Sequence, residues 1–146
     1  LNIIGNIQQL PSNAQKKVNL ALNRTKSSTG MALTIALSYS GRWEIIEAVK
    51  KICKSEKKPE EIQSFTEADF STYLSTYNLP DPELLIRTSG EYRLSNFLLW
   101  QLAYAELYFT NTLWPDFGKE DFYKALIEFQ GRERRFGKTS EQLVQP

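Results

Sequence analysis

Residues 31–42 read Met-Ala-Leu-Thr-Ile-Ala-Leu-Ser-Tyr-Ser-Gly-Arg. The run from Met31 to Tyr39 is almost entirely apolar, which is typical of a parallel β-strand that is covered on both faces. Ser40-Gly41 then predicts a turn, and apolar residues recur at helical spacing from Arg42 to Lys54. Because a buried strand that leads into a helix is typical of α/β architecture, this stretch decides the fold class.

The same alternation continues on both sides of this stretch. Further strands are predicted at 1–5, 84–87 and 107–109, and further helices at 12–26, 59–63, 66–77, 96–104 and 119–132. Ser12, Thr66 and Ser95 are the expected N-caps of three of these helices, and Asp69 stands at the N3 position after Thr66, which predicts a capping box. We therefore expect one domain over residues 1–146, with a parallel sheet flanked by helices and ligands beyond the carboxyl ends of its strands.

The composition excludes several classes of protein. There are 18 Lys and Arg residues against 17 Asp and Glu, so a net charge of +1 gives no general basis for nucleic-acid binding. The chain has no histidine, which removes histidine-based triads, general bases and metal sites. Cys53 is the only cysteine, which suits a reducing cytoplasm. No apolar run approaches the roughly 20 residues of a transmembrane segment.

The segment 87–96, Arg-Thr-Ser-Gly-Glu-Tyr-Arg-Leu-Ser-Asn, has the clearest chemical pattern. Arg87 closes a predicted strand, and Arg93 and Ser95 stand before a predicted helix. Two guanidinium groups, a hydroxyl and free helix N–H groups at one place would form a diphosphate site, because arginine binds phosphate oxygens bidentately. The alternative is a loop with surface salt bridges, for instance to Glu91 and Asp81.

Three further patterns have two interpretations each. Glu106 lies among apolar and aromatic residues, so it needs either an arginine partner or a cation, and magnesium prefers such oxygen ligands. The segment 131–138 carries four positive charges and one negative, which indicates either a solvated basic tail or a second phosphate contact. The junction 38–42 could bind an anion or form a tight turn, and we favour the turn.

The block from Asp81 to Phe117 resembles the signature of the cis-prenyltransferases. Residues 81–101 read Asp-Pro-Glu-Leu-Leu-Ile-Arg-Thr-Ser-Gly-Glu-Tyr-Arg-Leu-Ser-Asn-Phe-Leu-Leu-Trp-Gln, and the likeness continues through 104–109, 114–117 and 132–137. The resemblance extends over nearly the whole chain. The sequence is most similar to the bacterial members of the family, which make undecaprenyl diphosphate.

The resemblance implies roles for particular residues. Arg87, Arg93 and Ser95 match the residues that bind the headgroup of isopentenyl diphosphate. Glu106 matches the acidic residue that helps to hold Mg2+ and reaches across the interface of a homodimer. These four roles are expectations that come from the family.

Two more residues match a motif near the end of the family's chains. Arg135 and Gly137 correspond to an Arg-x-Gly motif that contributes to diphosphate binding across the dimer interface. The chain also departs from the family, which usually has Asn-Tyr-Gly-Gly-Arg at 38–42 and Gly-Asp at 5–6. These differences weaken any role for Ser38 and Asn6.

The family's Asp-Gly-Asn-Gly-Arg-Trp motif does not occur in the sequence. We therefore expect an incomplete cis-prenyltransferase fold that lacks its N-terminal strands, the chain being the C-terminal part of the catalytic domain. The essential aspartate is expected in that N-terminal part, so no catalytic residue is expected in this chain, and the isolated chain is expected to be inactive.

The resemblance implies that the full-length parent is a magnesium-dependent transferase. It would condense isopentenyl diphosphate onto farnesyl diphosphate, whose site is mostly in the missing part, to give undecaprenyl diphosphate for the cell-wall lipid carrier. A cytoplasmic homodimer is expected, with peripheral contact at the inner membrane face only through its lipid product. The alternative is a non-catalytic partner subunit, against which the intact Arg87 and Arg93 argue.

Overall fold

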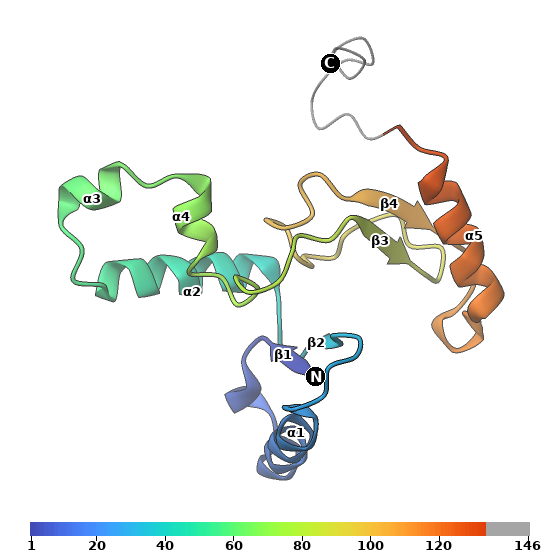
Figure 1. Cartoon of the computed structure of the whole chain (residues 1–146), viewed down its shortest axis with the longest axis horizontal. Helices are drawn as coiled ribbons and strands as arrows, with labels where there is room; N and C mark the ends of the chain where they lie inside the picture. Colours follow the sequence, from blue (N-terminus) through green and yellow to red (C-terminus); the bar gives the residue numbers. More distant parts are fainter. Residues whose placement is uncertain (134–146) are drawn as a thin grey trace. The chain divides into compact units, whose positions relative to one another are not determined.

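The structure, a computed structural model, describes residues 1–133 (Figure 1). They form two compact units. The first comprises Leu1–Pro80 with Asn96–Leu98, and the second comprises Asp81–Ser95 with the chain from Leu99 onward. In this described part, no helix has the length and apolar character needed to cross a bilayer. The prediction of a single domain stays a prediction.

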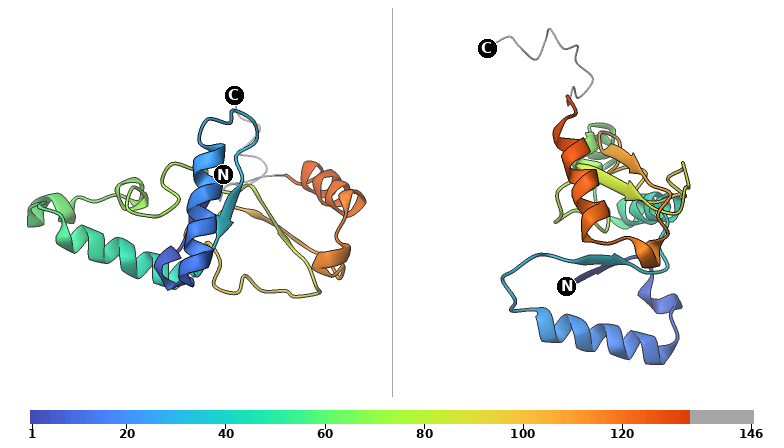
Figure 2. Two further views of the ribbon diagram at one scale, coloured as in Figure 1. Left: turned by 90° about the horizontal axis from the view of Figure 1, so that it is seen from below. Right: turned by 90° about the vertical axis from the view of Figure 1, so that its right-hand side faces the viewer.

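The first unit begins with a strand–helix–strand arrangement. β1 (Asn2–Ile4) pairs in parallel with β2 (Thr34–Ala36), with Ile3 opposite Ile35. Between them come η1 (Ile7–Gln9) and α1 (Ser12–Thr25), and α1 lies along one face of the strand pair in both views of Figure 2. Two strands joined by a crossover helix are the parallel unit that the alternating pattern predicts.

Two details of this arrangement correct the sequence-based prediction. The strand expected over 31–39 is limited to Thr34–Ala36, because its partner β1 ends at Ile4, directly before Gly5, whose φ is +104°. The expected cap of α1 is also wrong, because Pro11 occupies the N-cap position and makes no side-chain hydrogen bond there.

α2 (Gly41–Lys54) follows its sequence signals closely. The hydroxyl of Ser40 accepts a hydrogen bond from the N–H of Trp43, which caps the helix. Glu44 lies in the first turn, and Lys51 and Lys54 lie in the last, so their charges complement the helix dipole.

The buried carboxylate of Glu44 ties α2 to a distant segment. Glu44 is only 3% exposed. Its Oε2 accepts a hydrogen bond from the Tyr39 hydroxyl at 2.6 Å, and its Oε1 accepts one from the Ser75 N–H at 2.9 Å and another from the Ser75 hydroxyl. These bonds compensate the cost of taking a charged group out of water.

Two short helices complete the first unit. α3 (Pro59–Gln63) forms as predicted. α4 (Glu67–Ser71) begins with the predicted capping box, in which Thr66 and Asp69 bond each other's backbone N–H groups. α4 ends at Ser71, however, and not near residue 77 as predicted.

The second unit is built on another parallel pair. β3 (Leu84–Arg87) pairs with β4 (Glu106–Phe109), with Leu84 opposite Glu106 and Arg87 opposite Phe109. After η2 (Trp114–Asp116), α5 (Lys119–Gln130) contacts β4, as Figure 1 shows. The α/β class with parallel strand pairs and helices is therefore confirmed.

The predicted helix over 96–104 is wrong. The structure has turns and bends there, and the backbone of Ser95, Asn96 and Leu98 has φ values of +51°, +60° and +44°. A right-handed helix requires negative φ at every residue, so these positions exclude it. The connection between β3 and β4 is thus an irregular segment over residues 88–105.

Candidate functional site

Arg87 stands at the carboxyl end of β3. It is half-buried, and its carbonyl oxygen accepts a hydrogen bond from the N–H of Thr110 at 2.9 Å, which continues the ladder to β4. In a parallel α/β sheet, ligands bind beyond this end of the strands. The position of Arg87 therefore suits a ligand-binding side chain.

The loop after Arg87 is held against the segment that follows β4. The N–H groups of Ser89 and Gly90 donate to the carbonyl oxygens of Thr112 and Thr110, both at 2.9 Å. Ser89 and Gly90 have φ values of +70° and +66°. A Cβ atom on Gly90 would lie 3.0 Å from Oδ1 of Asn111, so the absence of a side chain permits this close approach.

Arg93 and Ser95 follow later in the same loop, and both are exposed. The guanidinium of Arg93 forms an ion pair with the carboxylate of Glu91, as the salt-bridge interpretation of this segment predicts. Exposed pairs of this kind contribute little stability, so an anionic ligand could compete for Arg93. The loop thus carries Arg87, Arg93 and Ser95, but without the helix N-terminus that the sequence predicts behind Ser95.

The segment immediately after Ser95 is bonded to the start of α2. The carbonyl oxygen of Asn96 accepts from the N–H of Gly41 at 2.7 Å, and its side-chain Oδ1 accepts from the N–H of Arg42 at 2.9 Å. With Ser40 capping Trp43, these first N–H groups of α2 have protein partners. The turn interpretation of residues 38–42 is therefore favoured over an anion site, and the Arg42 side chain remains exposed.

Glu106 begins β4 and has an arginine partner. Its Oε2 lies 2.9 Å from Nη1 of Arg132, and the two side chains are 27% and 28% exposed. Nη1 of Arg132 also donates to the carbonyl oxygen of Leu107 at 2.9 Å, while Nη2 pairs with Glu128. The ion pair with Glu128, and then that with Glu106, raises the pKa of Arg132 above its usual range.

The sequence left open whether the partner of Glu106 is an arginine or a cation. Of the two partners expected for Glu106, the structure contains the arginine. Arg132 belongs to the predicted basic tail, yet its guanidinium is not simply solvated, because it is paired with Glu106 and Glu128. Arg135 and Gly137 lie outside the described residues.

The described residues contain no complete set of metal-binding side chains. Over residues 1–133, no three acidic or cysteine side chains lie close enough to hold a metal ion. Magnesium, however, is often held by one or two carboxylates together with substrate phosphates and water. Glu106 fits such a shared site as a single carboxylate whose Oε2 is engaged by Arg132.

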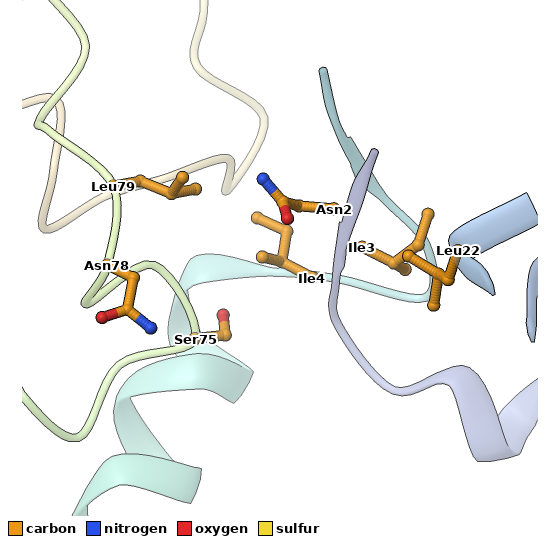
Figure 3. Close-up of a pocket in the computed structure, with 7 residues that line it drawn as sticks. All are labelled: Asn2, Ile3, Ile4, Leu22, Ser75, Asn78 and Leu79. Atoms are coloured by element: carbon orange, nitrogen blue, oxygen red, sulfur yellow. The ribbon is translucent and has the colours of Figure 1, made fainter. Parts of the chain in front are cut away.

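An open cleft lies in the first unit (Figure 3). It has a volume of about 460 Å3 and is lined by Asn2, Ile3, Ile4, Leu22, Ser75, Asn78 and Leu79. The lining has no charged residue, so it offers nothing that would attract a diphosphate. The charged candidates and this cleft are therefore distinct features of the chain.

Asn96 is the residue whose contribution the sequence analysis missed. Its two hydrogen bonds join positions 54 and 55 residues apart in the sequence. The sequence offered one weak signal, namely that asparagine tolerates positive φ better than most residues. Nothing in the local pattern identifies α2 as its partner.

Comparison with known proteins defines the class. Residues 1–137 match the family model described as putative undecaprenyl diphosphate synthase. The chain belongs to this cis-prenyltransferase family.

Particular relatives support this assignment. The chain is 53% identical to the isoprenyl transferase of Chlorobaculum tepidum, covering 98% of this chain and 54% of the relative. It is 46% identical to the ditrans,polycis-undecaprenyl-diphosphate synthase of Coxiella burnetii, specific for (2E,6E)-farnesyl diphosphate, covering 98% and 61%. The chain thus spans somewhat more than half the length of these curated relatives.

Solved structures agree with the sequence matches. Lavandulyl diphosphate synthase from Lavandula x intermedia, in complex with dimethylallyl diphosphate, superposes with a TM-score of 0.87 at 40% identity, covering 94% of this chain and 59% of that one. A probable undecaprenyl diphosphate synthase from Campylobacter jejuni gives a TM-score of 0.80 at 36% identity, covering 94% and 62%.

Proposed function

We propose that this chain supplies the isopentenyl diphosphate site of a cis-prenyltransferase. The observation that carries the proposal is the loop after β3, with Arg87 at its start and Arg93 and Ser95 exposed further along. The curated relatives named as undecaprenyl-diphosphate synthases support the reaction, in which isopentenyl diphosphate is condensed repeatedly onto farnesyl diphosphate. The product would serve as the lipid carrier for cell-wall synthesis.

We infer that the loop positions the diphosphate headgroup of the substrate. Arg87 and Arg93 bind the diphosphate through their planar guanidinium groups, and Ser95 donates a hydroxyl hydrogen bond. The bound headgroup then holds the isopentenyl chain in line with the allylic carbon of the second substrate, from which diphosphate departs. Catalysis of this kind depends on orientation and on electrostatic stabilisation of the leaving group.

Magnesium belongs to the same proposal. When bound, the ion would neutralise charge on the diphosphates and assist the departure of pyrophosphate. In this chain Glu106 would contribute one carboxylate ligand, since its Oε1 is not the oxygen that bonds Arg132. Binding of the ion does not require the ion pair to break, because Arg132 engages Oε2.

The remaining parts of the proposal concern the whole protein. The fold would be completed by N-terminal strands that carry the essential aspartate and most of the farnesyl diphosphate site, this chain being the C-terminal part of one catalytic domain. A homodimer would bring Glu106 and the Arg135-x-Gly137 motif to the partner's substrates. We place the protein in the cytoplasm, with membrane contact only through its product.

Calorimetric titration of isopentenyl diphosphate into the chain tests the proposal. Arg93→Ala should weaken binding by about tenfold or more, because a charge-assisted hydrogen bond contributes about 1.5–3 kcal/mol. Arg24→Ala is the matched control, since Arg24 is an exposed arginine in the last turn of α1, within the other unit. Equal binding by both variants would contradict the assignment of the loop.

A further inference from the structure

We propose that Thr110 is a positioning residue for the diphosphate loop, residues 87–95, which it holds through its backbone and its hydroxyl. The inference rests on the function proposed above and extends it to a residue that does not itself contact the ligand. Thr110 follows β4 directly and lies in the second unit together with the whole loop. The contacts between Thr110, its neighbours and the loop are therefore made within one unit.

The backbone of Thr110 is bonded to both ends of the turn 87–90. Its N–H donates to the carbonyl oxygen of Arg87 at 2.9 Å, and its carbonyl oxygen accepts from the N–H of Gly90, also at 2.9 Å. Gly90 has a φ of +66°, and a Cβ atom there would lie 3.0 Å from Oδ1 of Asn111. The turn thus lies close against residues 110–111, and a displacement of Thr110 would displace the backbone of Arg87.

The hydroxyl of Thr110 fixes a further contact of the loop. Its Oγ1 accepts a hydrogen bond from the N–H of Thr112 at 3.2 Å and donates one to the hydroxyl of Thr112 at 3.1 Å. A bond from a threonine hydroxyl to the N–H two residues on stabilises a tight turn. This turn orients Thr112, whose carbonyl oxygen accepts from the N–H of Ser89 at 2.9 Å. The Thr110 side chain therefore helps to place an acceptor that holds the loop.

The residue before Thr110 contacts the loop next to Arg93. The ring of Phe109 packs against the ring of Tyr92, with centroids 5.3 Å apart. Tyr92 immediately precedes Arg93, so this contact restrains the backbone from which the Arg93 side chain extends. The segment 109–112 thus contacts the loop at residues 87, 89, 90 and 92. A site whose groups are already ordered loses less entropy when it binds a ligand.

Two substitutions separate the hydroxyl of Thr110 from its shape. Thr110→Val keeps a branched side chain but removes the hydroxyl, so the N–H of Thr112 loses this acceptor. Thr110→Ser keeps the hydroxyl and removes only the methyl group. If the hydroxyl positions the loop, the serine variant should bind isopentenyl diphosphate like the unchanged chain, and the valine variant should bind it more weakly.

Thr25→Val is the matched control for the loss of a hydroxyl hydrogen bond elsewhere. The half-buried hydroxyl of Thr25 donates to the carbonyl oxygen of Ala21 at 2.9 Å, at the end of α1 in the other unit. Its removal leaves the contacts of the segment 109–112 unchanged. Whatever its effect on the melting temperature, this variant should bind isopentenyl diphosphate within about twofold of the unchanged chain.

The experiment combines titration with isopentenyl diphosphate, thermal unfolding and amide hydrogen exchange for the four chains. We expect the dissociation constant to rise about three- to tenfold in Thr110→Val and by less than about twofold in Thr110→Ser and Thr25→Val. The amide of Ser89 should exchange about threefold faster or more in Thr110→Val, because its acceptor is less restrained.

Three results would overturn the inference. The first is unchanged affinity in a folded Thr110→Val chain, and the second is an unchanged exchange rate of the Ser89 amide in that chain. The third is equally weak binding by Thr110→Ser and Thr110→Val, because the hydroxyl would then not be the group that matters.

Arg93→Ala, titrated in the same series, separates this inference from the proposed function. If Arg93→Ala weakens binding and Thr110→Val does not, only the positioning role is wrong. If Arg93→Ala leaves binding unchanged, or if the unchanged chain does not bind isopentenyl diphosphate, the proposed function fails and the positioning role fails with it.

Discussion

Nη1 of Arg132 lies 2.9 Å from Oε2 of Glu106 and 2.9 Å from the carbonyl oxygen of Leu107. One guanidinium, on the second residue beyond α5, thus contacts the first two residues of β4. Both charged side chains are less than one third exposed, so water screens their attraction less than at an open surface. The proposed metal-binding carboxylate therefore has a fixed position before any ligand arrives.

Arg132→Ala should lower the free energy of unfolding by about 1.5–3 kcal/mol, because hydrogen bonds to charged groups contribute this much. Lys124→Ala is the control, since its ion pair with Asp121 spans one exposed turn of α5 and should change stability by less than about 0.5 kcal/mol. Urea unfolding measures both variants. Equal stability in the two would show that the Arg132 ion pair contributes no more than an ordinary surface pair.

Glu91→Gln should tighten the binding of isopentenyl diphosphate. In the unliganded chain Glu91 pairs with Arg93, and this pair competes with an incoming diphosphate. Exposed pairs contribute up to about 1 kcal/mol, so the gain is at most about fivefold and should diminish at high salt.

Titration calorimetry at two salt concentrations measures this effect. Glu120→Gln provides the matched control, because it removes the same charge from the exposed first turn of α5. Weaker binding in the Glu91 variant would mean that Glu91 supports Arg93 and does not compete for it.

The capping box of α4 should make stability depend on acid pH. The hydrogen bonds from the Thr66 hydroxyl and backbone N–H lower the pKa of Asp69 below its ordinary value of 3.8. A carboxylate with a lowered folded-state pKa contributes stability that is fully present above 3.8 and is lost as the pH falls through the folded-state value.

An NMR titration of Asp69 checks this. Thr66→Ala should return the pKa of Asp69 toward 3.8, because it removes the hydrogen bond from the Thr66 hydroxyl, which is the largest cause of the lowered pKa. Ser71→Ala leaves both hydrogen bonds of Asp69 to Thr66 intact and should keep its pKa low. A pKa for Asp69 that is the same in all three chains would contradict the capping box.

Gly5→Ala should destabilise the first unit strongly. A Cβ atom at Gly5 would lie 2.1 Å from the carbonyl oxygen of Leu37, and the φ of +104° is unfavourable for alanine. The backbone strain alone costs about 1–3 kcal/mol, and the contact with Leu37 adds to it.

Gly30→Ala is the comparison, because nothing lies within 4 Å of a Cβ at Gly30. The free energy of unfolding of the Gly30→Ala variant should be unchanged or should rise by up to about 1 kcal/mol, since alanine lowers the conformational entropy of the unfolded chain. Thermal unfolding should therefore show a clearly lower melting temperature for Gly5→Ala and an unchanged or higher one for Gly30→Ala. Equal changes in melting temperature would contradict the close approach at Gly5.

Local patterns in the sequence predicted much of the fold correctly. The segments that became β1, β3, α2 and α5 were recognised from apolar periodicity. The capping box of α4 was recognised from Thr66 and Asp69 alone. These features depend on residues within one or two turns of one another, so the information is contained in short stretches.

The errors occurred where distant residues decide the conformation. Ser95, as a possible N-cap, indicated a helix over 96–104, but Asn96 accepts hydrogen bonds from Gly41 and Arg42 and has a positive φ, which excludes a helix there. β2 is shorter than its apolar run, because a strand extends only as far as its partner.

For the candidate site, the sequence by itself determined which chemical groups are present. Two arginines and a serine on one loop, and an acidic residue that required a partner, were evident from residue types and spacing. Only the tertiary structure decided that Arg132 is the partner of Glu106 and that Asn96 accepts hydrogen bonds from the first residues of α2. Each of these contacts joins segments more than 20 residues apart, and no local preference of the chain specifies which distant groups will meet.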